Sequence, residues 1–327
     1  MTAFGDPKIG VRRERLTYDA PQAGQVLVRV LTAGAGLPDA MMAAGAYPLV
    51  GDPPFGLGEE VAGEVVEVAD GSKFSVGDRI MGITAFLAGW GGYADYTYVV
   101  EQSAVVIPEA LSDEQAGGFP IAYRTAFAGL VERSNVQAGE TLVVLGGGGS
   151  SGLAAIQMGK AYGARVIAVA GSAEKLSLAS AAGADAVINY RSVDLAEELL
   201  ARTDGRGVDL IFDVVGGSTA AAAVKALGRD GRIAMVGLAS GAPVVLDSLD
   251  MILRNYTAVG VLAVATPEAD AIAWARLVEL VEAGYLSTQV GRVWSLDDVP
   301  AMITQQTAPV PGKSVVRVAA PSIPIQP

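Results

Sequence analysis

Residues 145–152 read Leu145-Gly146-Gly147-Gly148-Gly149-Ser150-Ser151-Gly152. Gly147, Gly149 and Gly152 match the pattern G-x-G-x-x-G, between an apolar strand pattern at 141–145 and a helix pattern at 152–162. Glycine permits a tight turn and a close approach of backbone to ligand, and a helix N-terminus offers free N–H groups to phosphate. This context favours a dinucleotide pyrophosphate loop over a ligand-free turn. Ser150 and Ser151 are expected to donate hydroxyl hydrogen bonds or to cap the helix.

From about residue 120 onward, apolar strand patterns alternate with helix patterns. Strands that are almost wholly apolar are typical of a parallel sheet covered by helices on both faces. Residues 120–288 are therefore predicted to form a Rossmann-type doubly wound α/β domain, with Tyr256–Val264 as an apolar edge strand. The expected strands are 141–145, 165–170, 186–189, 208–214 and 232–236, and the expected helices are 152–162, 173–182, about 195–202, 219–227 and 269–283.

The two ends of the chain have a different pattern. Residues 1–119 contain short strands, such as Val26–Leu31 and Val61–Val68, separated by glycine and proline. Residues from about 290 onward return to short strands and turns. Many short strands with such turns predict a compact, barrel-like domain. We expect 1–119 and 289–327 to form this second, β-rich domain together.

The end of the second strand of the α/β region predicts which dinucleotide binds. NAD-binding domains usually place an Asp or Glu at that point to bind the ribose 2′-hydroxyl. Here strand 165–170 ends in Gly171 and Ser172, and Lys175 follows. A hydroxyl donor and an ammonium group favour a 2′-phosphate, which a carboxylate would repel. The sequence therefore predicts NADP(H) as cofactor, although a lysine here can also be a solvated helix residue.

Two residue types are missing from the chain, and their absence narrows the chemistry. The sequence has no cysteine and no histidine. It therefore has no disulfide, no thiolate nucleophile and no imidazole base. Zinc in proteins is held mainly by Cys and His, with Asp or Glu as supplements. We expect no metal site, which excludes zinc alcohol dehydrogenase, zinc protease and zinc deaminase chemistry.

Charge and hydropathy indicate where the protein works. The 327 residues carry 23 basic and 35 acidic side chains, a net charge of −12, without a long basic cluster. Nucleic-acid binding is therefore not expected. No apolar run reaches the roughly 20 residues of a membrane span, and no export signal precedes the first strand. We expect a cytoplasmic protein that acts on a small-molecule substrate.

Taken together, these residues resemble the medium-chain dehydrogenase/reductase superfamily, in particular its zinc-free quinone oxidoreductase and enoyl reductase branch. The resemblance covers nearly the whole chain and implies a GroES-like catalytic domain beside the Rossmann domain. It rests on Gly45-Ala46-Tyr47-Pro48, Gly58-Glu59-Glu60-Val61-Ala62-Gly63, Val76-Gly77-Asp78-Arg79-Ile80, Ala122-Tyr123-Arg124-Thr125-Ala126, Val187-Ile188-Asn189-Tyr190 and Pro311-Gly312-Lys313-Ser314-Val315.

The resemblance also implies roles for single residues. Thr125 and Lys313 match positions that contact the cofactor, and Tyr190 joins Ser172 and Lys175 at the positions of the NADPH phosphate. Tyr47 matches the tyrosine that enoyl reductases of this branch place beside the transferred hydride; alternatively it only packs beside Pro48. Three departures from the family pattern stand out. Gly36 replaces an Asn that contacts nicotinamide and substrate, and Ser150 replaces a glycine of the phosphate loop. An arginine often found shortly before the Gly-Lys pair is not evident in Gln305-Gln306-Thr307.

A site without metal or histidine favours one reaction class. Reducing a simple carbonyl develops an alkoxide, which usually needs a Lewis acid or a strong proton donor. Reducing an enone or a quinone instead spreads the charge over an enolate or phenolate, for which a few oriented donors suffice. We therefore expect NADPH-dependent reduction of a conjugated acceptor, with Tyr47 or water as proton donor. A crystallin-like or sensor protein that binds NADPH without useful turnover is the alternative.

Two further features concern assembly and substrate. The apolar stretch Tyr256–Val264 has few charges to protect an exposed edge, and such edges tend to be paired. We expect a homodimer through this strand, as in relatives of the branch. The physiological substrate, and the choice between quinone and enoyl compounds, depend on loops and stay open at the level of sequence.

Overall fold

The structure is a computed structural model that describes residues 1–306 and 310–318. The chain divides into two compact units. The first unit comprises residues 1–121, 266–282 and 290–327, and the second comprises 122–265 and 283–289. The segment 266–282 therefore groups with the β-rich unit, although the sequence pattern placed it in the α/β domain. The domain boundaries 119/120 and 288/289 stay predictions.

The core of the first unit is a small closed β-barrel. Strand β1 pairs antiparallel with β2 on one side and with β4 on the other, and β3 joins β2 to β4, so the four strands close on themselves. Strands β12 and β11 extend the sheet beyond β1. The strands are β1 (Gln25–Ala35), β2 (Glu60–Val68), β3 (Arg79–Thr84), β4 (Tyr96–Val106), β11 (Val290–Ser295) and β12 (Lys313–Arg317).

Alternation of side chains fills this barrel. In β1, Val26, Val28 and Val30 are almost completely buried and form one core with residues of the other strands. Successive side chains of a strand point to opposite faces, so these three valines, which occupy every second position, all face inward. The unit also contains the 16-residue helix α10 (Pro267–Glu282) and several short helices. The short ones are α1 (Pro7–Gly10), α2 (Leu37–Ala43), η1 (Phe86–Ala88), α3 (Asp113–Gly117), η3 (Leu296–Asp298) and α11 (Val299–Gln305).

The second unit is built on one parallel sheet of six strands. Their order is β10-β9-β8-β5-β6-β7, and every neighbouring pair is parallel. The order reverses at β5, which lies between β8 and β6, as in a Rossmann fold. The strands are β5 (Thr141–Leu145), β6 (Arg165–Ala170), β7 (Ala186–Asn189), β8 (Val208–Asp213), β9 (Leu227–Met235) and β10 (Thr257–Gly260).

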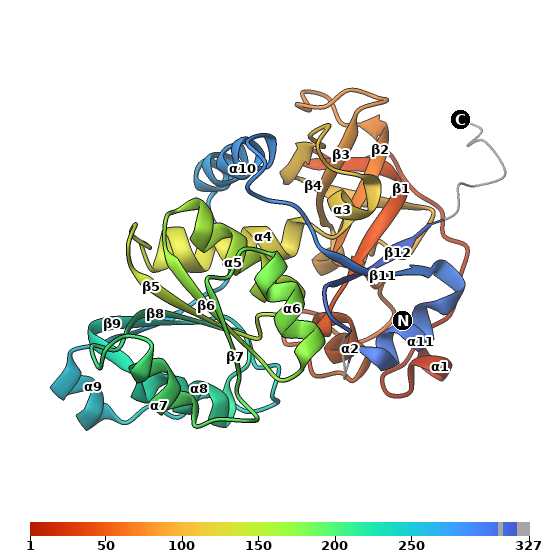
Figure 1. Ribbon diagram of the computed structural model, residues 1–327. Helices are drawn as coiled ribbons and strands as arrows, with labels where there is room; N and C mark the ends of the chain where they lie inside the picture. The colour runs from red at the N-terminus through yellow and green to blue at the C-terminus, as the bar shows by residue number, and fades with distance from the viewer. Residues whose placement is uncertain (307–309, 319–327) are drawn as a thin grey trace. The chain divides into compact units, whose positions relative to one another are not determined.

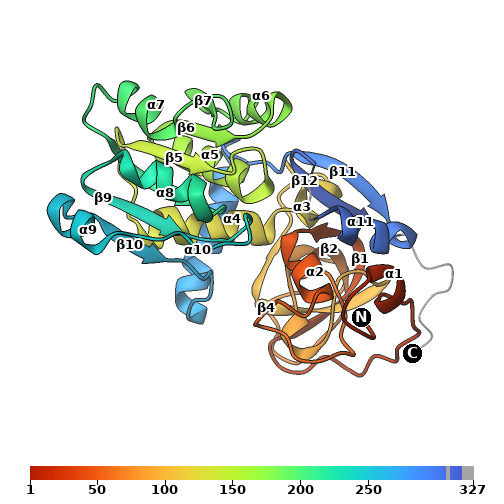
Figure 2. The same ribbon diagram turned by 90° about the horizontal axis from the view of Figure 1, so that it is seen from below.

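Helices cover both faces of this sheet. Because βαβ crossovers are right-handed, connections that run in opposite directions from β5 place their helices on opposite faces. Figure 1 shows α5 on one face of the sheet and α7 and α8 on the other, and Figure 2 shows the same layers from below. The helices are α4 (Pro120–Phe127), the π-helical η2 (Ala128–Arg133), α5 (Ser150–Ala161), α6 (Ala173–Ala181), α7 (Leu195–Ala201), α8 (Gly217–Lys225) and α9 (Ser248–Arg254).

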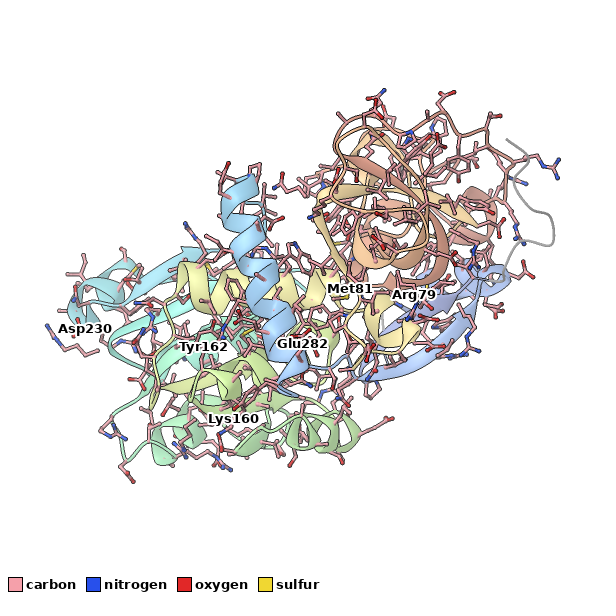
Figure 3. The ribbon with its side chains drawn as sticks, turned by 90° about the horizontal axis from the view of Figure 1, so that it is seen from above. Arg79, Met81, Lys160, Tyr162, Asp230 and Glu282 are labelled. Atoms are coloured by element: carbon pink, nitrogen blue, oxygen red, sulfur yellow. The ribbon has the colours of Figure 1, made fainter. Side chains whose placement is uncertain are left out.

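Polar contacts fix the end of α5 relative to the strands. Lys160, labelled near Tyr162 in Figure 3, donates to both carboxylate oxygens of Asp185 at 2.8 Å. The same carboxylate accepts from the backbone N–H of Val166 at 2.7 Å. These contacts connect the C-terminal turn of α5 to the start of β6. They fix the position of α5, which begins at the glycine loop.

The fold predicted from sequence is confirmed, with local differences. The edge strand expected over Tyr256–Val264 is shorter, because β10 covers only Thr257–Gly260. Among residues 1–306 and 310–318, no strand follows β10 in the sheet order to accept further ladder hydrogen bonds. The stretch after residue 36, for which the sequence pattern predicted no helix, contains α2. Across the described residues, no helix combines the length and the apolar character that a membrane crossing requires.

Candidate active site

The glycine loop connects β5 to α5 as the sequence predicts. Gly149 is the N-cap residue of α5, and Leu153 N–H is the first to bond back to it, at 2.9 Å. The N–H groups of Ser150, Ser151 and Gly152 therefore stand in the first turn, where an α-helix provides no acceptor. Three converging donors and the partial positive charge of a 12-residue helix form a site for phosphate.

The loop packs closely against itself and against β6 only because its residues lack side chains. A Cβ on Gly152 would stand 2.2 Å from the carbonyl oxygen of Gly146, and one on Gly147 would stand 2.9 Å from Cβ of Ala168. Only Gly146 has a positive φ, of +73°, so the left-handed turn lies one residue before the three-glycine pattern. A Cβ on Gly149 would have no neighbouring atom nearer than the carbonyl oxygen of Gly146, at 3.6 Å, so space remains beside this residue for a pyrophosphate.

The two serines are not caps. The N-cap position belongs to Gly149, so the sequence expectation that Ser150 or Ser151 might cap α5 is wrong. The reason is that the helix begins two residues earlier than its apolar pattern, and both serines become part of its first turn. Both are partly exposed. Their alternative role, donation to a phosphate oxygen, stays a prediction.

Polar side chains gather at the end of β6 and form what we call the β6-end cluster: Ser172, Lys175, Tyr190 and Arg191. Ser172 is the N-cap of α6, and its hydroxyl accepts from the N–H of Lys175 at 3.3 Å. The Lys175 stem lies against the glycine loop, because a Cβ on Gly148 would stand 2.4 Å from its Cβ. The cluster is therefore adjacent to the phosphate loop.

Tyr190 and Arg191 close the other side of this cluster. A Cβ on Gly171 would stand 3.0 Å from the Tyr190 hydroxyl oxygen and 3.0 Å from Nε of Arg191. The Arg191 guanidinium carbon is 5.8 Å from the centre of the Tyr190 ring. Side chains that carry hydroxyl, ammonium and guanidinium groups thus flank the end of β6, Lys175 beside the glycine loop and Tyr190 and Arg191 beside Gly171, and these groups bind phosphate well. Sequence reasoning missed Arg191, although it directly follows Tyr190.

Thr125 lies on α4 in the same unit. It is partly exposed, whereas its neighbours Tyr123 and Arg124 are buried. The Tyr123 hydroxyl donates to the carbonyl oxygen of Ser287 at 2.6 Å, and Arg124 pairs with Glu132 at 3.0 Å. These two contacts fix the orientation of α4 and leave Thr125 on its accessible side. Its contact with a cofactor stays a prediction.

The β-rich unit contains a second polar site, the buried carboxylate cluster: Asp39, Tyr47, Glu59, Glu60, Tyr93 and Lys313. Glu60, the first residue of β2, pairs with the Lys313 ammonium of β12 and accepts the N–H of Ile121 at 2.8 Å. Asp39, in α2, accepts the N–H groups of Gly36 at 2.8 Å and Gly58 at 3.2 Å. Both carboxylates are therefore well provided with donors.

Glu59 differs from these neighbours. It is 7% exposed, and its Oε1 has no hydrogen-bond partner among the described residues. Burial, and then the negative charge of Asp39, raise the pKa of Glu59 to about 8. A hydrogen bond with the Tyr47 hydroxyl acts in the opposite direction on this pKa. Glu59 is therefore a carboxylic acid that keeps its proton near neutral pH.

Tyr47 combines a packing surface with this polar contact. Its ring packs against the barrel core, as the alternative sequence interpretation expected. Its hydroxyl faces Glu59, and burial together with that carboxyl and Asp39 raises the pKa of Tyr47 above its ordinary value of 10.0. Burial likewise raises the pKa of Asp39 to about 6. Within the cluster, burial thus favours the protonated form of Asp39, Tyr47 and Glu59.

Two known protein families match this chain. The family described as "Alcohol dehydrogenase GroES-like domain" matches residues 22–109, and the family described as "Zinc-binding dehydrogenase" matches residues 152–282. Quinone oxidoreductase-like protein 2 of Bos taurus is 31% identical over 292 residues, which cover 88% of this chain and 82% of the relative. This chain is an oxidoreductase of the medium-chain dehydrogenase/reductase family, in its quinone oxidoreductase branch.

Solved structures agree with this family. A probable oxidoreductase from Mycobacterium abscessus has a TM-score of 0.84 and 30% identity, covering 97% of this chain and 96% of that one. The Escherichia coli quinone oxidoreductase complexed with NADPH has a TM-score of 0.87 and 27% identity, covering 97% and 98%. The expectation of a Rossmann-type domain and a GroES-like domain is thereby confirmed.

One of the two matching families is described as a zinc-binding dehydrogenase, but the side chains of this chain offer few ligands for zinc. The chain has no His and no Cys. Within residues 1–306 and 310–318, no group of three Asp or Glu side chains could hold an ion. Tetrahedral zinc relies on thiolate and imidazole donors. The donor set of this family member therefore does not fit zinc.

Lys313 and Gly36 show how this chain differs within its family. Sequence reasoning expected Lys313 to touch the cofactor, but the side chain is 4% exposed and its ammonium pairs with Glu60. A direct cofactor contact stays a prediction. Gly36 has an extended φ of −153°, and a Cβ there would meet only Cδ of Pro38, at 3.3 Å. The backbone conformation at this position therefore suits any residue, but a side chain such as Asn would require Pro38 to shift slightly.

Proposed function

We propose that this oxidoreductase uses NADPH to reduce a conjugated acceptor, a quinone or an α,β-unsaturated carbonyl, without a metal ion. The observation that carries the proposal is the β6-end cluster beside the glycine loop, where hydroxyl, ammonium and guanidinium groups occur together and no acidic residue ends β6. The NADPH complex of the similar Escherichia coli enzyme supports it. Bound here, NADPH supplies the hydride.

The β6-end cluster accounts for the choice of NADPH over NADH. Lys175 and Arg191 bring two positive charges to the point where β6 ends, and Ser172 and Tyr190 bring two hydroxyl groups. A phosphate on the ribose would complete charge-assisted hydrogen bonds with these groups, each worth roughly 1.5–3 kcal/mol. NADH would leave them without an acceptor. Discrimination of at least about a hundredfold in kcat/KM is expected.

The choice of a conjugated acceptor follows from the groups that can stabilise negative charge. The chain lacks the imidazole and thiolate ligands of catalytic zinc, so an alkoxide from a simple ketone would find no Lewis acid. An enolate or a hydroquinone anion spreads its charge and needs only hydrogen-bond donors. Tyr47 is the donor that the β-rich unit offers, backed by the protonated carboxyl of Glu59.

A substrate panel tests this proposal. Purified protein, incubated with a chelator and dialysed, should oxidise NADPH with cyclohexenone or a benzoquinone and should be much slower with NADH or with cyclohexanone. Activity that requires added zinc, or turnover of the saturated ketone at an equal rate, would contradict the proposed function. Tight NADPH binding without turnover of either acceptor class would instead support the sensor-like alternative.

We also propose that the protein assembles as a homodimer along the outer edge of β10. In the described part of the chain β10 pairs only with β9, and the residues beyond it include Leu262 and Val264, which are 65% and 76% exposed. Exposed apolar strand edges tend to be covered by another chain. Sedimentation should give a dimer, and replacing both side chains by lysine should give monomers. A wild-type monomer would refute this assembly.

A further inference from the structure

Glu59 differs from the buried acid beside it. Glu60 forms an ion pair, whereas no such pair holds Glu59 within the described residues. Glu60 uses both its oxygens, one for the Lys313 ammonium and one for the N–H of Ile121. Glu59 is equally inaccessible, yet its Oε1 is without a partner among the described residues. Burying an ionised carboxylate without partners is costly, whereas burying the neutral acid costs much less. Retaining an acid here therefore suggests a role for its proton.

Charged and titratable groups from several elements face this carboxyl. They are two carboxyl groups, two phenols and one ammonium ion. One of the phenols is in hydrogen-bond contact with Glu59, and the ammonium ion is paired with one of the two carboxyl groups. The acids come from α2 and β2, the ammonium from β12, and the phenols from the loops before β2 and β4: Asp39, Glu60, Lys313, Tyr47 and Tyr93. The negative groups favour the protonated form of Glu59, and burial favours it further.

The Tyr47 hydroxyl needs such a neighbour if it is to act as an acid. Burial and the adjacent carboxyls raise the pKa of Tyr47, so a free phenolate in this place would be strongly disfavoured. A proton donor works best when its pKa lies near the operating pH. The pKa of Tyr47 is too high to meet that condition. Glu59 meets it, because burial raises the pKa of Glu59 to about 8, and Glu59 can pass its proton on through Tyr47.

We propose that Glu59 is the proton source for Tyr47. Glu59 is a positioning residue: its buried carboxyl hydrogen-bonds the Tyr47 phenol and replaces the proton of the phenol as the phenol protonates the reduced substrate. This inference rests on the proposed function. In the step, the Tyr47 O–H bond breaks as a C–H or O–H bond forms on the substrate anion. The Glu59 O–H bond breaks as a new O–H bond forms on Tyr47. Glu59 becomes a carboxylate and regains its proton from solvent, and the two electrons come with the hydride.

The protonation of Glu59 also sets the direction of the hydrogen bond. The protonated carboxyl donates to the Tyr47 oxygen, which leaves the phenol hydrogen free to point at a substrate. The ionised carboxylate can only accept, so the phenol hydrogen then points at Glu59. Turnover should therefore fall as pH rises through the pKa of Glu59, near 8. The sign follows because the active form is the protonated one.

The first experiment needs no turnover. ¹³C NMR of the cofactor-free protein with carboxyl-labelled glutamate should show one signal, absent in Glu59→Gln, that titrates near 8. A Glu59 signal that titrates in the ordinary range of glutamate would overturn the proposal.

The second experiment follows kcat against pH with NADPH and cyclohexenone. Wild type should lose activity above about pH 8, and Glu59→Gln should lose at least about tenfold in kcat together with this alkaline limb. Glu67→Gln, at an exposed position of the same strand, should keep both. An alkaline limb that persists in Glu59→Gln would mean a purely structural role. If no acceptor is turned over by wild type, the proposed function fails, while the NMR titration still decides whether Glu59 holds the proton.

Discussion

The clearest physical consequence of the buried carboxylate cluster is that Glu59→Gln should change stability with pH. In the unfolded chain Glu59 ionises around its ordinary pKa of 4.5, whereas burial and Asp39 raise the folded-state pKa to about 8. A folded pKa above the unfolded one means that the folded state binds the proton more tightly. The stability that this proton provides is complete below 4.5 and is lost as pH rises through 8.

The magnitude follows from the two pKa values. At about 1.4 kcal/mol per pKa unit, the gap between 4.5 and about 8 corresponds to at most about 5 kcal/mol of unfolding free energy. Between pH ~5 and pH ~9, most of this, roughly 4 kcal/mol, should be lost in the wild type. Glutamine has a similar shape and no titration, so Glu59→Gln should not lose it. The Tm of the variant relative to wild type should therefore rise by about 10 °C over that range.

The assay is thermal unfolding followed by circular dichroism in matched buffers across this pH range. Glu67→Gln is the control, because that glutamate is exposed on the same strand and its replacement should shift Tm equally at every pH. A Tm difference between Glu59→Gln and wild type that stays constant with pH would show that Glu59 ionises normally in the folded protein. The reasoning about the cluster would then be refuted.

Three further variants test the remaining parts of the site. Gly152→Ala should weaken NADPH binding at least about a hundredfold in a fluorescence titration, because its Cβ would stand 2.2 Å from a loop carbonyl oxygen. The control Gly51→Ala should bind NADPH normally, because a Cβ there would have no atom within 4 Å. Lys175→Ala should raise Kd for NADPH about tenfold and leave NADH unchanged, and equal losses for both would exclude a 2′-phosphate contact. Tyr47→Phe should lower kcat with an enone at least about tenfold, about 1.4 kcal/mol, while Tyr285→Phe at an exposed position should not; an unaltered rate would remove Tyr47 from the reaction.

The sequence predicted the parts of the structure that local rules govern. The strand, glycine turn and helix around Gly149 follow each other within 21 residues, 141–161, and each has its own local signal. The absence of an acid at the end of β6 could be predicted for the same reason, because Ser172 and Lys175 follow that strand closely in the sequence. Even there, the helix began two residues earlier than its apolar pattern, so the first-turn serines were misread as possible caps.

The buried carboxylate cluster could not be predicted in this way. Glu60 and Lys313 are 253 residues apart, and Asp39 reaches the backbone of Gly58 across 19. Two adjacent glutamates at the start of a strand read as one buried and one exposed side chain, because strands alternate. In the structure both are buried, since Glu59 stands before the first regular pair of β2. Only a residue-by-residue account of burial and partners distinguishes the paired acid from the unpaired one.

The account depends most on the claim that a hydride from NADPH reaches the conjugated carbon of an acceptor without help from a metal. The direct measurement uses NADPH deuterated at C4, cyclohexenone, and protein freed of metal by a chelator, with the product examined by NMR. Deuterium should appear on the β-carbon of saturated cyclohexanone. Deuterium on the carbonyl carbon of an alcohol, or transfer only after zinc is restored, would contradict the account.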